Sequence, residues 1–333
     1  MPLRFRRVNG NLPSVTVLIA ARPGQAEIKA VQASRLLEYP ADRLEIIVAR
    51  GKQPSVQRNA GIKAARGELI YFLDDDSVPL ASNLQQALAT FGDSKVQMLG
   101  GPNCCPPEAP SLEKVFALVL GSWLAFGPSR ARYLPVGEKR ETSEKELILC
   151  NLIARKDPLL QMGGFNEALY PNEENALMDE LQKNGGKLIY DPKFLVYRRP
   201  RSTLKAFAKM LMTYGRGRAE QFRQHPTFGS VLNFVPPLFL LYVLLLIVLS
   251  FLHIPQLIRV LLLIPLFLYI VILLGQMLGL VSQGGLLRSI AATPLMVLSH
   301  LLYGAGFWRG LFTRFKAPEQ RMTQAEVILE KVL

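Results

Sequence analysis

Along the first two thirds of this 333-residue chain, short apolar runs alternate with stretches whose apolar residues recur at helical spacing. Short apolar runs bounded by turn residues predict strands, and the longer stretches predict helices between them. Strands that alternate with helices imply a sheet of mostly parallel strands joined by right-handed crossovers. The predicted strands are 15–20, 44–48, 69–73, 96–99, 146–154, 187–190 and 194–197, and the predicted helices are 25–38, 54–65, 79–91 and 175–183.

The pattern changes after about residue 224. Three stretches without a charged residue follow, at 231–252, 260–287 and 289–308. As a helix, each is long enough to cross a hydrocarbon core of about 30 Å. Buried core helices are the alternative, but three such stretches in succession favour insertion into a membrane.

A basic segment precedes these stretches. Between Lys193 and Arg223 the chain has nine Lys or Arg residues and one acid, Glu220. Apolar residues at helical spacing oppose Lys205 and Lys209, which predicts an amphipathic helix at the membrane interface. Nucleic acid is another partner of basic segments, but the adjacent apolar stretches favour anionic lipid headgroups.

Composition adds the compartment. The net charge is +13, and the N-terminal residues are basic without an apolar region after them, so no signal peptide is predicted. The soluble part is therefore expected in the cytoplasm. Cys104, Cys105 and Cys150 have neither metal-site nor disulfide spacing, and we interpret them as packing residues.

Three carboxylates end the apolar run 69–73. Asp74, Asp75 and Asp76 fall at the carboxyl end of a predicted interior strand, where parallel sheets bind their ligands. Like charges this close need a compensating cation, and a hard divalent ion that bridges carboxylate and diphosphate oxygens meets that need. A solvated acidic turn is the alternative. The turn at 21–25 lacks GxGxxG and GxxxxGK[ST], which again favours a metal as the holder of phosphates.

Several segments in order resemble the family 2 glycosyltransferases. Residues 57–68, which run into the aspartate triplet, resemble the family's RNxGIxxAxGExIxFLDxD block. Residues 163–167, 172–175 and 185–187 resemble its acceptor-side block. Residues 214–218, with the apolar stretches behind them, are similar to the succinoglycan-type exopolysaccharide enzymes. The resemblance covers about residues 14–224, and the ordered combination of motifs makes it specific.

The resemblance implies a GT-A fold, which is Rossmann-like with a mostly parallel sheet, and inverting sugar transfer with Mg²⁺ or Mn²⁺. It makes Asp76 the metal ligand and Glu174 the general base, with Glu173 in reserve. One base and one cation suffice for a single in-line displacement at an anomeric carbon. For the acid pair, a helix N-terminus is the alternative reading. The residues implied to contact the nucleotide sugar are Asp74, Asp75, Arg58, Asn59, Ala21, Arg22 and Gly101.

The chain also departs from the family's pattern. Residues 49–53 replace an Asp-rich turn that contacts the nucleotide base, so the base stays open, with a UDP-sugar as the favoured donor. Arg50 and Lys52 are candidates for phosphate contact or for a solvated loop. Arg216 and Arg218 are candidates for a diphosphate or lipid phosphate, or for simple anchoring on the inner side of the membrane. Around Gly101, a donor sugar against bare backbone and a plain turn are both open.

We therefore predict a cytoplasmic GT-A domain at 1–200, a basic interfacial helix and linker at 201–228, about three transmembrane helices at 229–310 and a tail at 311–333. The predicted enzyme is a multi-pass inner-membrane glycosyltransferase of cell-surface polysaccharide assembly that adds one sugar to a polyprenyl-diphosphate glycan. The expected partners are a nucleoside diphosphate sugar, the lipid-linked acceptor and membrane lipids, without nucleic acid. The alternatives are a bare polyprenyl phosphate or a glycolipid as acceptor, and a non-catalytic scaffold of an export complex.

Overall fold

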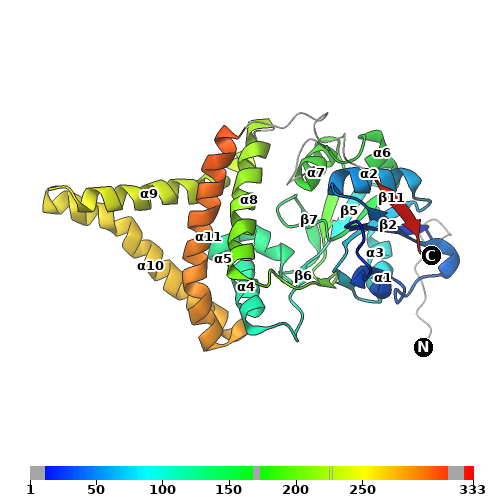
Figure 1. The fold of residues 1–333 in the computed structure, drawn as a ribbon, viewed down its shortest axis with the longest axis horizontal. Helices are drawn as coiled ribbons and strands as arrows, with labels where there is room; N and C mark the ends of the chain where they lie inside the picture. Colours follow the sequence, from blue (N-terminus) through cyan, green and yellow to red (C-terminus); the bar gives the residue numbers. More distant parts are fainter. Residues whose placement is uncertain (1–11, 168–172, 225, 227, 314–325) are drawn as a thin grey trace. The chain divides into compact units, whose positions relative to one another are not determined.

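The computed structural model describes residues 12–167, 173–224, 226, 228–313 and 326–333, and the chain forms two compact units (Figure 1). The first, here called the sheet unit, contains residues 1–106, 131–199 and 316–333. The second, here called the helical unit, contains residues 107–130 and 200–315. The aspartate triplet belongs to the sheet unit, and the long apolar helices belong to the helical unit.

A mixed sheet of eight strands in the order β11-β2-β1-β3-β8-β5-β9-β7 forms the sheet unit. Its strands are β1 (Val15–Ala21), β2 (Leu44–Arg50), β3 (Leu69–Asp74), β5 (Val96–Gly100), β7 (Arg140–Thr142), β8 (Asn151–Arg155), β9 (Lys187–Tyr190) and β11 (Ile328–Lys331). β1 pairs in parallel with β2 and β3, whereas β8 runs antiparallel to both β3 and β5. The predicted α/β class is confirmed. Five of the eight strands run in one direction, and β8, β7 and β11 run in the opposite direction, so the sheet is mixed.

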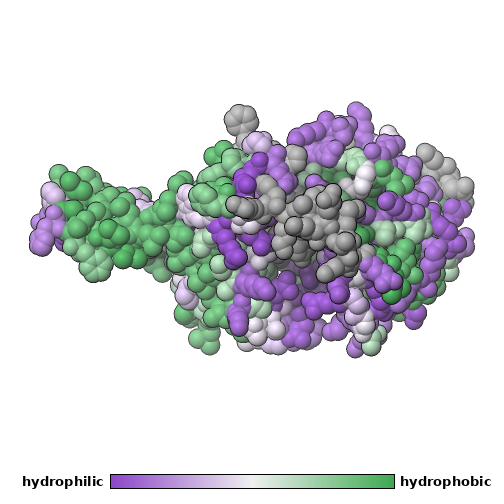
Figure 2. Space-filling view, turned by 45° about the horizontal axis from the view of Figure 1, so that its top comes forward, coloured by the Kyte–Doolittle hydropathy of each residue, from purple (hydrophilic) through white to green (hydrophobic). Residues whose placement is uncertain are grey.

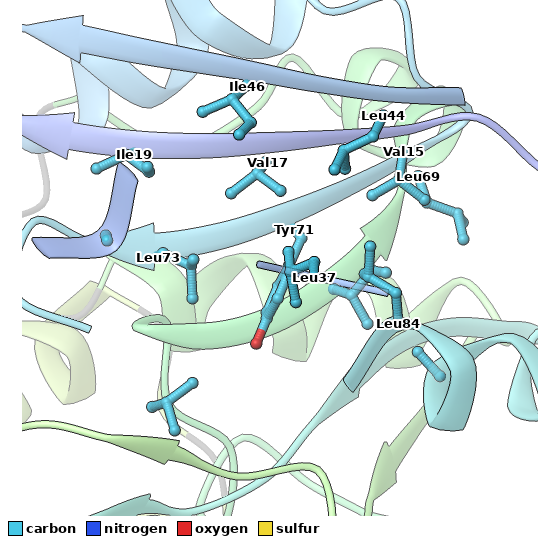
Figure 3. Packing of buried hydrophobic residues seen from close by; sticks show 14 of the residues in the cluster. Val15, Val17, Ile19, Leu37, Leu44, Ile46, Leu69, Tyr71, Leu73 and Leu84 are labelled. Carbon is cyan, nitrogen blue, oxygen red and sulfur yellow. The ribbon is translucent and has the colours of Figure 1, made fainter. Parts of the chain in front are cut away.

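Alternate residues of the central strands point to opposite faces, and each face has its own helices. On one face, Val17 and Ile19 of β1 cluster with Leu84 of α3 and with Leu37 (Figure 3). On the other, Leu18 clusters with residues of α2, α6 and α7. These helices are α1 (Lys29–Ser34) and α3 (Asn83–Thr90) on the first face, and α2 (Pro54–Ala64), α6 (Lys156–Gln161) and α7 (Glu173–Lys183) on the second. The strands are therefore buried on both faces, and their carboxyl ends are left to carry polar residues.

The helical unit consists of α4 (Ser111–Gly121), α5 (Trp123–Phe126), α8 (Leu204–Gln224), α9 (Val235–Ser250), α10 (Gln256–Gly284) and α11 (Leu286–Phe312). Three segments, Val231–Ser250, α10 and α11, are long and apolar enough to cross a membrane. The surface of α9 and α10 is predominantly hydrophobic (Figure 2). The basic segment that precedes them forms α8.

Glycine residues bring α8 and α11 into backbone contact. A Cβ atom on Gly306 would lie 2.1 Å from the carbonyl oxygen of Met212, and one on Gly310 would lie 2.4 Å from that of Arg216. The two glycines are four residues apart on one face of α11, a spacing that lets helices approach closely. Arg223 Nη1 also donates to the carbonyl oxygen of Gly310 at 3.1 Å. The contact positions advance together along both helices, so α8 and α11 run parallel as a tight pair.

Tyr242→Phe is expected to loosen α9 from α10. The Tyr242 hydroxyl donates to the carbonyl oxygen of Leu262 at 2.7 Å and accepts from the N–H of Leu266 at 3.1 Å, beside Pro265. It thus bridges two groups that bond to each other in a regular helix. We expect its loss to lower the free energy of unfolding by about 0.5–1.5 kcal/mol, the range found for single hydrogen bonds between packed helices. Unfolding titrations in detergent measure this, and an unchanged free energy would show that the hydroxyl does not hold the helices together.

Candidate functional site

The carboxyl end of β3 carries the aspartate triplet. Asp74 is the last residue of the strand, and Asp75 and Asp76 lie in the turn that leads to β4 (Val78–Pro79). The N–H of Ser77 donates to the carbonyl oxygen of Asp74 at 3.1 Å, and the N–H of Ala30 donates to that of Asp75 at 3.1 Å. All three aspartates are partly exposed. The turn is therefore fixed through its backbone, and its carboxylates stay accessible.

A buried arginine joins this triplet to the acid pair. Arg58 of α2 lies 3.0 Å from Asp74 Oδ1 through Nη2 and 3.4 Å from Glu173 Oε1 through Nη1. The side chains of Arg58 and Glu173 are 8 % and 3 % exposed, and Glu174 is less buried. Since β3, α2 and α7 each supply one member, the fold gathers residues that the sequence placed in separate motifs.

The environment of Glu173 makes the stability of the fold depend on pH. Burial raises the pKa of its carboxyl to about 8, with Glu174 adding to the effect and Arg58 opposing it. Between about pH 4.5 and 8, the folded protein holds a proton that the unfolded chain releases. The stabilisation that comes from this bound proton is therefore complete below about pH 4.5 and is lost as the pH rises toward 8.

Glu173→Gln is accordingly expected to flatten the pH dependence of the melting temperature. As the pH rises through this window, the melting temperature of the wild type should fall relative to that of the variant, because glutamine cannot ionise. Thermal scans of detergent-solubilised protein measure the two slopes. Glu27→Gln, at an exposed position, is the control and should keep the wild-type slope. Equal slopes for the wild type and Glu173→Gln would show that the pH dependence of the melting temperature does not come from Glu173.

A second arginine, which the sequence pattern assigned to the basic membrane-proximal segment, pairs with the triplet. The short strand β10 (Val196–Tyr197) pairs antiparallel with β4, so the chain returns beside the turn that holds the aspartates. Arg198, the next residue, places Nε 2.5 Å from Asp76 Oδ1 and Nη1 3.2 Å from Asp74 Oδ2. Its guanidinium therefore supplies positive charge at the position where the sequence predicted a compensating cation.

The donors in the turn fit a divalent ion that shares its coordination with a substrate. Within the described ranges, no group of three or more His, Cys, Asp or Glu side chains is arranged to hold a metal alone. Mg²⁺ and Mn²⁺ favour carboxylate oxygens, and one or two carboxylates together with substrate phosphates and water suffice for Mg²⁺. The Asp76 side chain is 44 % exposed, and its Oδ1 already pairs with the positively charged guanidinium of Arg198. Asp76 is thus suited to be the protein ligand of such an ion.

Arg198→Met is expected to tighten the binding of Mn²⁺ to the nucleotide-free protein by about tenfold, because the guanidinium no longer competes for Asp76. Titration of Mn²⁺ followed by electron paramagnetic resonance measures the affinity. Arg198→Lys keeps the charge near the carboxylates and should stay close to the wild type. Weaker binding in Arg198→Met would show instead that the guanidinium supports the ion.

Two residues predicted to contact the nucleotide sugar have structural partners. The Asn59 amide donates to the carbonyl oxygen of Phe165 at 2.9 Å and accepts from the N–H of Phe165 at 2.8 Å. These bonds tie α2 to the segment that was predicted to face the acceptor. A Cβ atom on Gly101 would lie 1.9 Å from the carbonyl oxygen of Phe194. The protein's own packing therefore explains both residue types, and their contact with a donor stays a prediction.

The turns after β1 and β2 are the remaining part of the predicted donor site. Ala21 is buried at the end of β1, and Arg22 is exposed directly after it. Arg50, which the sequence offered as a phosphate contact, pairs through Nε with Glu330 of β11 at 2.7 Å and donates through Nη1 to the carbonyl oxygen of Gln25 at 2.7 Å. Arg50 thus joins the first turn to the last strand.

Arg216 and Arg218 belong to α8 in the helical unit. Arg216 Nε lies 3.4 Å from Glu220 Oε1 one helical turn on, and Arg218 Nη1 donates to Gln221 Oε1 at 3.1 Å. These contacts within one helix support its surface, and the phosphate contact of the two arginines stays a prediction.

The glycosyl transferase family 2 matches this chain over residues 32–126. The chain is related to the family 2 glycosyltransferases. The matched stretch starts in α1 and includes Arg58 and the aspartate triplet, which are among the residues that carried the resemblance in the sequence.

Two relatives extend this match. The chain is 26 % identical over 175 residues to the Pre-mycofactocin glycosyltransferase of Mycobacterium tuberculosis, which covers 53 % of this chain and 36 % of that protein. It is 26 % identical over 235 residues to the Succinoglycan biosynthesis protein ExoA of Rhizobium meliloti, which covers 68 % of this chain and 64 % of that protein. The chain thus spans about a third of the first relative and less than two thirds of the second. The predicted likeness to succinoglycan-type enzymes is confirmed.

Among solved structures, the Mannosyltransferase PcManGT from Pyrobaculum calidifontis, in complex with GDP-Man and Mn²⁺, has a TM-score of 0.52 and 13 % sequence identity. The match covers 94 % of this chain and 91 % of that one. At this identity the likeness shows the fold alone, and it confirms the predicted GT-A architecture.

Proposed function

We propose that the protein is a glycosyltransferase of polysaccharide or glycoconjugate biosynthesis, which moves one sugar from a nucleoside diphosphate sugar to a lipid-linked acceptor with inversion. The single observation that carries the proposal is the network Asp76–Arg198–Asp74–Arg58–Glu173. It connects a carboxylate suited to a metal with a helix N-terminus that presents two acids. Together with the family match, this arrangement supports a metal site and a base on either side of one reaction centre.

Each residue of the network has a distinct task. Asp76 would hold Mg²⁺ or Mn²⁺, which when bound stabilises the charge of the departing diphosphate. Arg58 holds the Asp74 carboxylate in place, because the Arg58 guanidinium also donates to Glu173. Glu174, the more accessible acid, takes the proton of the acceptor hydroxyl as the new bond forms, with Glu173 as the alternative base.

The acceptor is proposed from the helical unit. The long apolar helices of this unit would keep the enzyme beside a substrate whose tail stays in the bilayer. A polyprenyl-diphosphate glycan at the cytoplasmic face of the inner membrane fits this setting, and polyprenyl phosphate and glycolipids are the alternatives. UDP-sugars remain the favoured donors, and the GDP-Man of the structural neighbour makes GDP-sugars the first comparison.

The test uses membranes that carry the full chain, lipid extract as acceptor, and labelled UDP- and GDP-sugars with Mn²⁺ or EDTA. We expect one donor to label the lipid fraction with Mn²⁺ only. Glu174→Gln should lower the rate by about 10²–10⁴-fold, as expected for the loss of a general base. Glu180→Gln, at an exposed position of the same helix, should leave the rate unchanged.

The outcomes separate the alternatives. Loss of activity in Glu173→Gln with activity retained in Glu174→Gln would transfer the role of base to Glu173. The chemical nature of the labelled lipid distinguishes the acceptors. No labelling with any donor, although the protein binds a nucleotide sugar and acceptor is supplied, would refute transfer and favour a non-catalytic scaffold.

A further inference from the structure

The last strand of the sheet constrains how the chain can pass through a membrane. We infer that the chain crosses the bilayer twice, through a hairpin of α9 and α10, and that α11 lies with α8 at the surface on the side of the sheet unit. This inference rests on the membrane anchoring proposed above and is independent of the transfer chemistry.

The first step is an argument from parity. β11 pairs antiparallel with β2, with Leu329 opposite Ala49. Two ion pairs strengthen this pairing, because Glu330 lies 2.7 Å from Arg50 and Lys331 lies 3.3 Å from Glu45. A folded sheet lies on one side of a bilayer, since hydrocarbon offers no partners to backbone groups at its edges and loops. The chain leaves this sheet unit after residue 199 and is in it again at residue 328, so it crosses an even number of times. The three candidate spans cannot all cross.

Burial indicates which candidate does not. In the apolar window of α11, 39 % of the residues are buried within the protein, against 6 % in each of the other two candidate spans. The structure describes α11 from end to end, and its exposed large hydrophobic residues lie only near the ends, at Leu286, Leu287, Ile290 and Phe312. α9 and α10 expose such residues along their whole length. Only α9 and α10 thus present the continuous apolar surface that lipid chains require.

The partner of α11 supports the same assignment. α8 carries five basic residues in 21 positions, which are Lys205, Lys209, Arg216, Arg218 and Arg223. Such side chains are costly in hydrocarbon and favourable beside anionic headgroups, so α8 belongs at the interface. Because α11 touches α8 backbone to backbone through Gly306 and Gly310, it must lie at the same depth. In Figure 1, α8 and α11 run side by side, whereas α9 leaves α11 at a steep angle.

The remaining two helices have the features of a hairpin that crosses a membrane. The turn 251–255 joins α9 to α10, and the exposed residues His253 and Arg259 place polar groups at this end. Tyr242 bridges the carbonyl oxygen of Leu262 and the N–H of Leu266, which holds the two helices together without water. From residue 260 to 284, α10 has no charged residue and is long enough to return through a core of about 30 Å.

Labelling of single cysteines tests the inference. In a full-length variant in which Cys104, Cys105 and Cys150 are replaced by serine, cysteine is placed at one site at a time and exposed to a membrane-impermeant maleimide in sealed vesicles. Leu36→Cys reports the sheet unit, His253→Cys the turn of the hairpin, and Glu326→Cys and Leu333→Cys the two sides of β11. All four positions are exposed.

We expect Glu326→Cys and Leu333→Cys to be labelled from the same side as Leu36→Cys, and His253→Cys from the opposite side only. If Glu326→Cys and Leu333→Cys were labelled from the same side as His253→Cys and opposite to Leu36→Cys, the number of crossings would be odd, which would overturn the inference. Labelling of His253→Cys from the same side as Leu36→Cys would refute membrane crossing by α9 and α10, and with it the proposed anchoring. Transfer of labelled sugar, measured on the same vesicles, reports separately on the proposed activity and on the folding of the variants.

Discussion

Asp76→Asn is expected to lower metal-dependent sugar transfer by about a hundredfold or more, the scale on which single groups that stabilise developing charge act in enzymes. Asparagine is nearly isosteric, but it removes the negative charge that attracts a divalent ion to the turn after β3. It also removes one of the two carboxylates that pair with Arg198. The rate of lipid labelling and the affinity for Mn²⁺ should therefore fall together.

The control for this prediction is Asp42→Asn, because the Asp42 side chain is 79 % exposed and lies in the sheet unit outside the network. It should change neither quantity. Full transfer by Asp76→Asn, with wild-type affinity for Mn²⁺, would refute the assignment of Asp76 as the metal ligand. A loss of transfer with unchanged Mn²⁺ affinity would place Asp76 against the donor rather than the ion.

Gly306→Leu is expected to destabilise the helical unit by about 3 kcal/mol or more, the upper end of the usual cost of overpacking. The new Cβ atom would lie 2.1 Å from the carbonyl oxygen of Met212, which is backbone and cannot rotate away. α8 and α11 would have to separate, and the contact of Arg223 with the end of α11 would be lost with them. Unfolding titrations in detergent measure the change.

Gly275→Leu is the matched control. It makes the same substitution inside α10, where a Cβ atom would meet nothing within 4 Å. Because leucine favours a helix more than glycine does and meets no neighbour here, this variant should be as stable as the wild type or more so. A similar loss of stability in both variants would show that the close approach of α8 and α11 is not what Gly306 provides.

The aspartate triplet was predictable from the sequence because its position depends on local information. The apolar run 69–73 defines a buried strand, and a strand this regular ends where its charges begin, as β3 does. Arg58 and Glu173 were found through motifs, and the fold brings them within one network. Features that one segment encodes by itself, through the spacing of its apolar residues and the residues at its ends, could therefore be inferred without the structure.

Arg198 and β11 could not be inferred in this way. Arg198 reaches the triplet only because two strands of two residues each, β4 and β10, pair across more than a hundred positions of the chain. The arginine itself looked like one of nine basic residues beside a membrane. β11 has four residues and was assigned to a tail, because so short a strand is recognisable only beside its partner β2. In both cases the information lies in the pairing of distant segments.

The place of β11 in the sheet determines the order in which parts of the fold can form during synthesis. The ribosome makes β2 early, but the strand that covers its outer edge emerges only after residues 204–312 have been synthesised. Until then, β2 presents an open edge, which is a site of pairing with other chains. On the proposed topology, the hairpin of α9 and α10 is therefore synthesised before the sheet can be completed. A chain interrupted before residue 328 would leave the edge of β2 open.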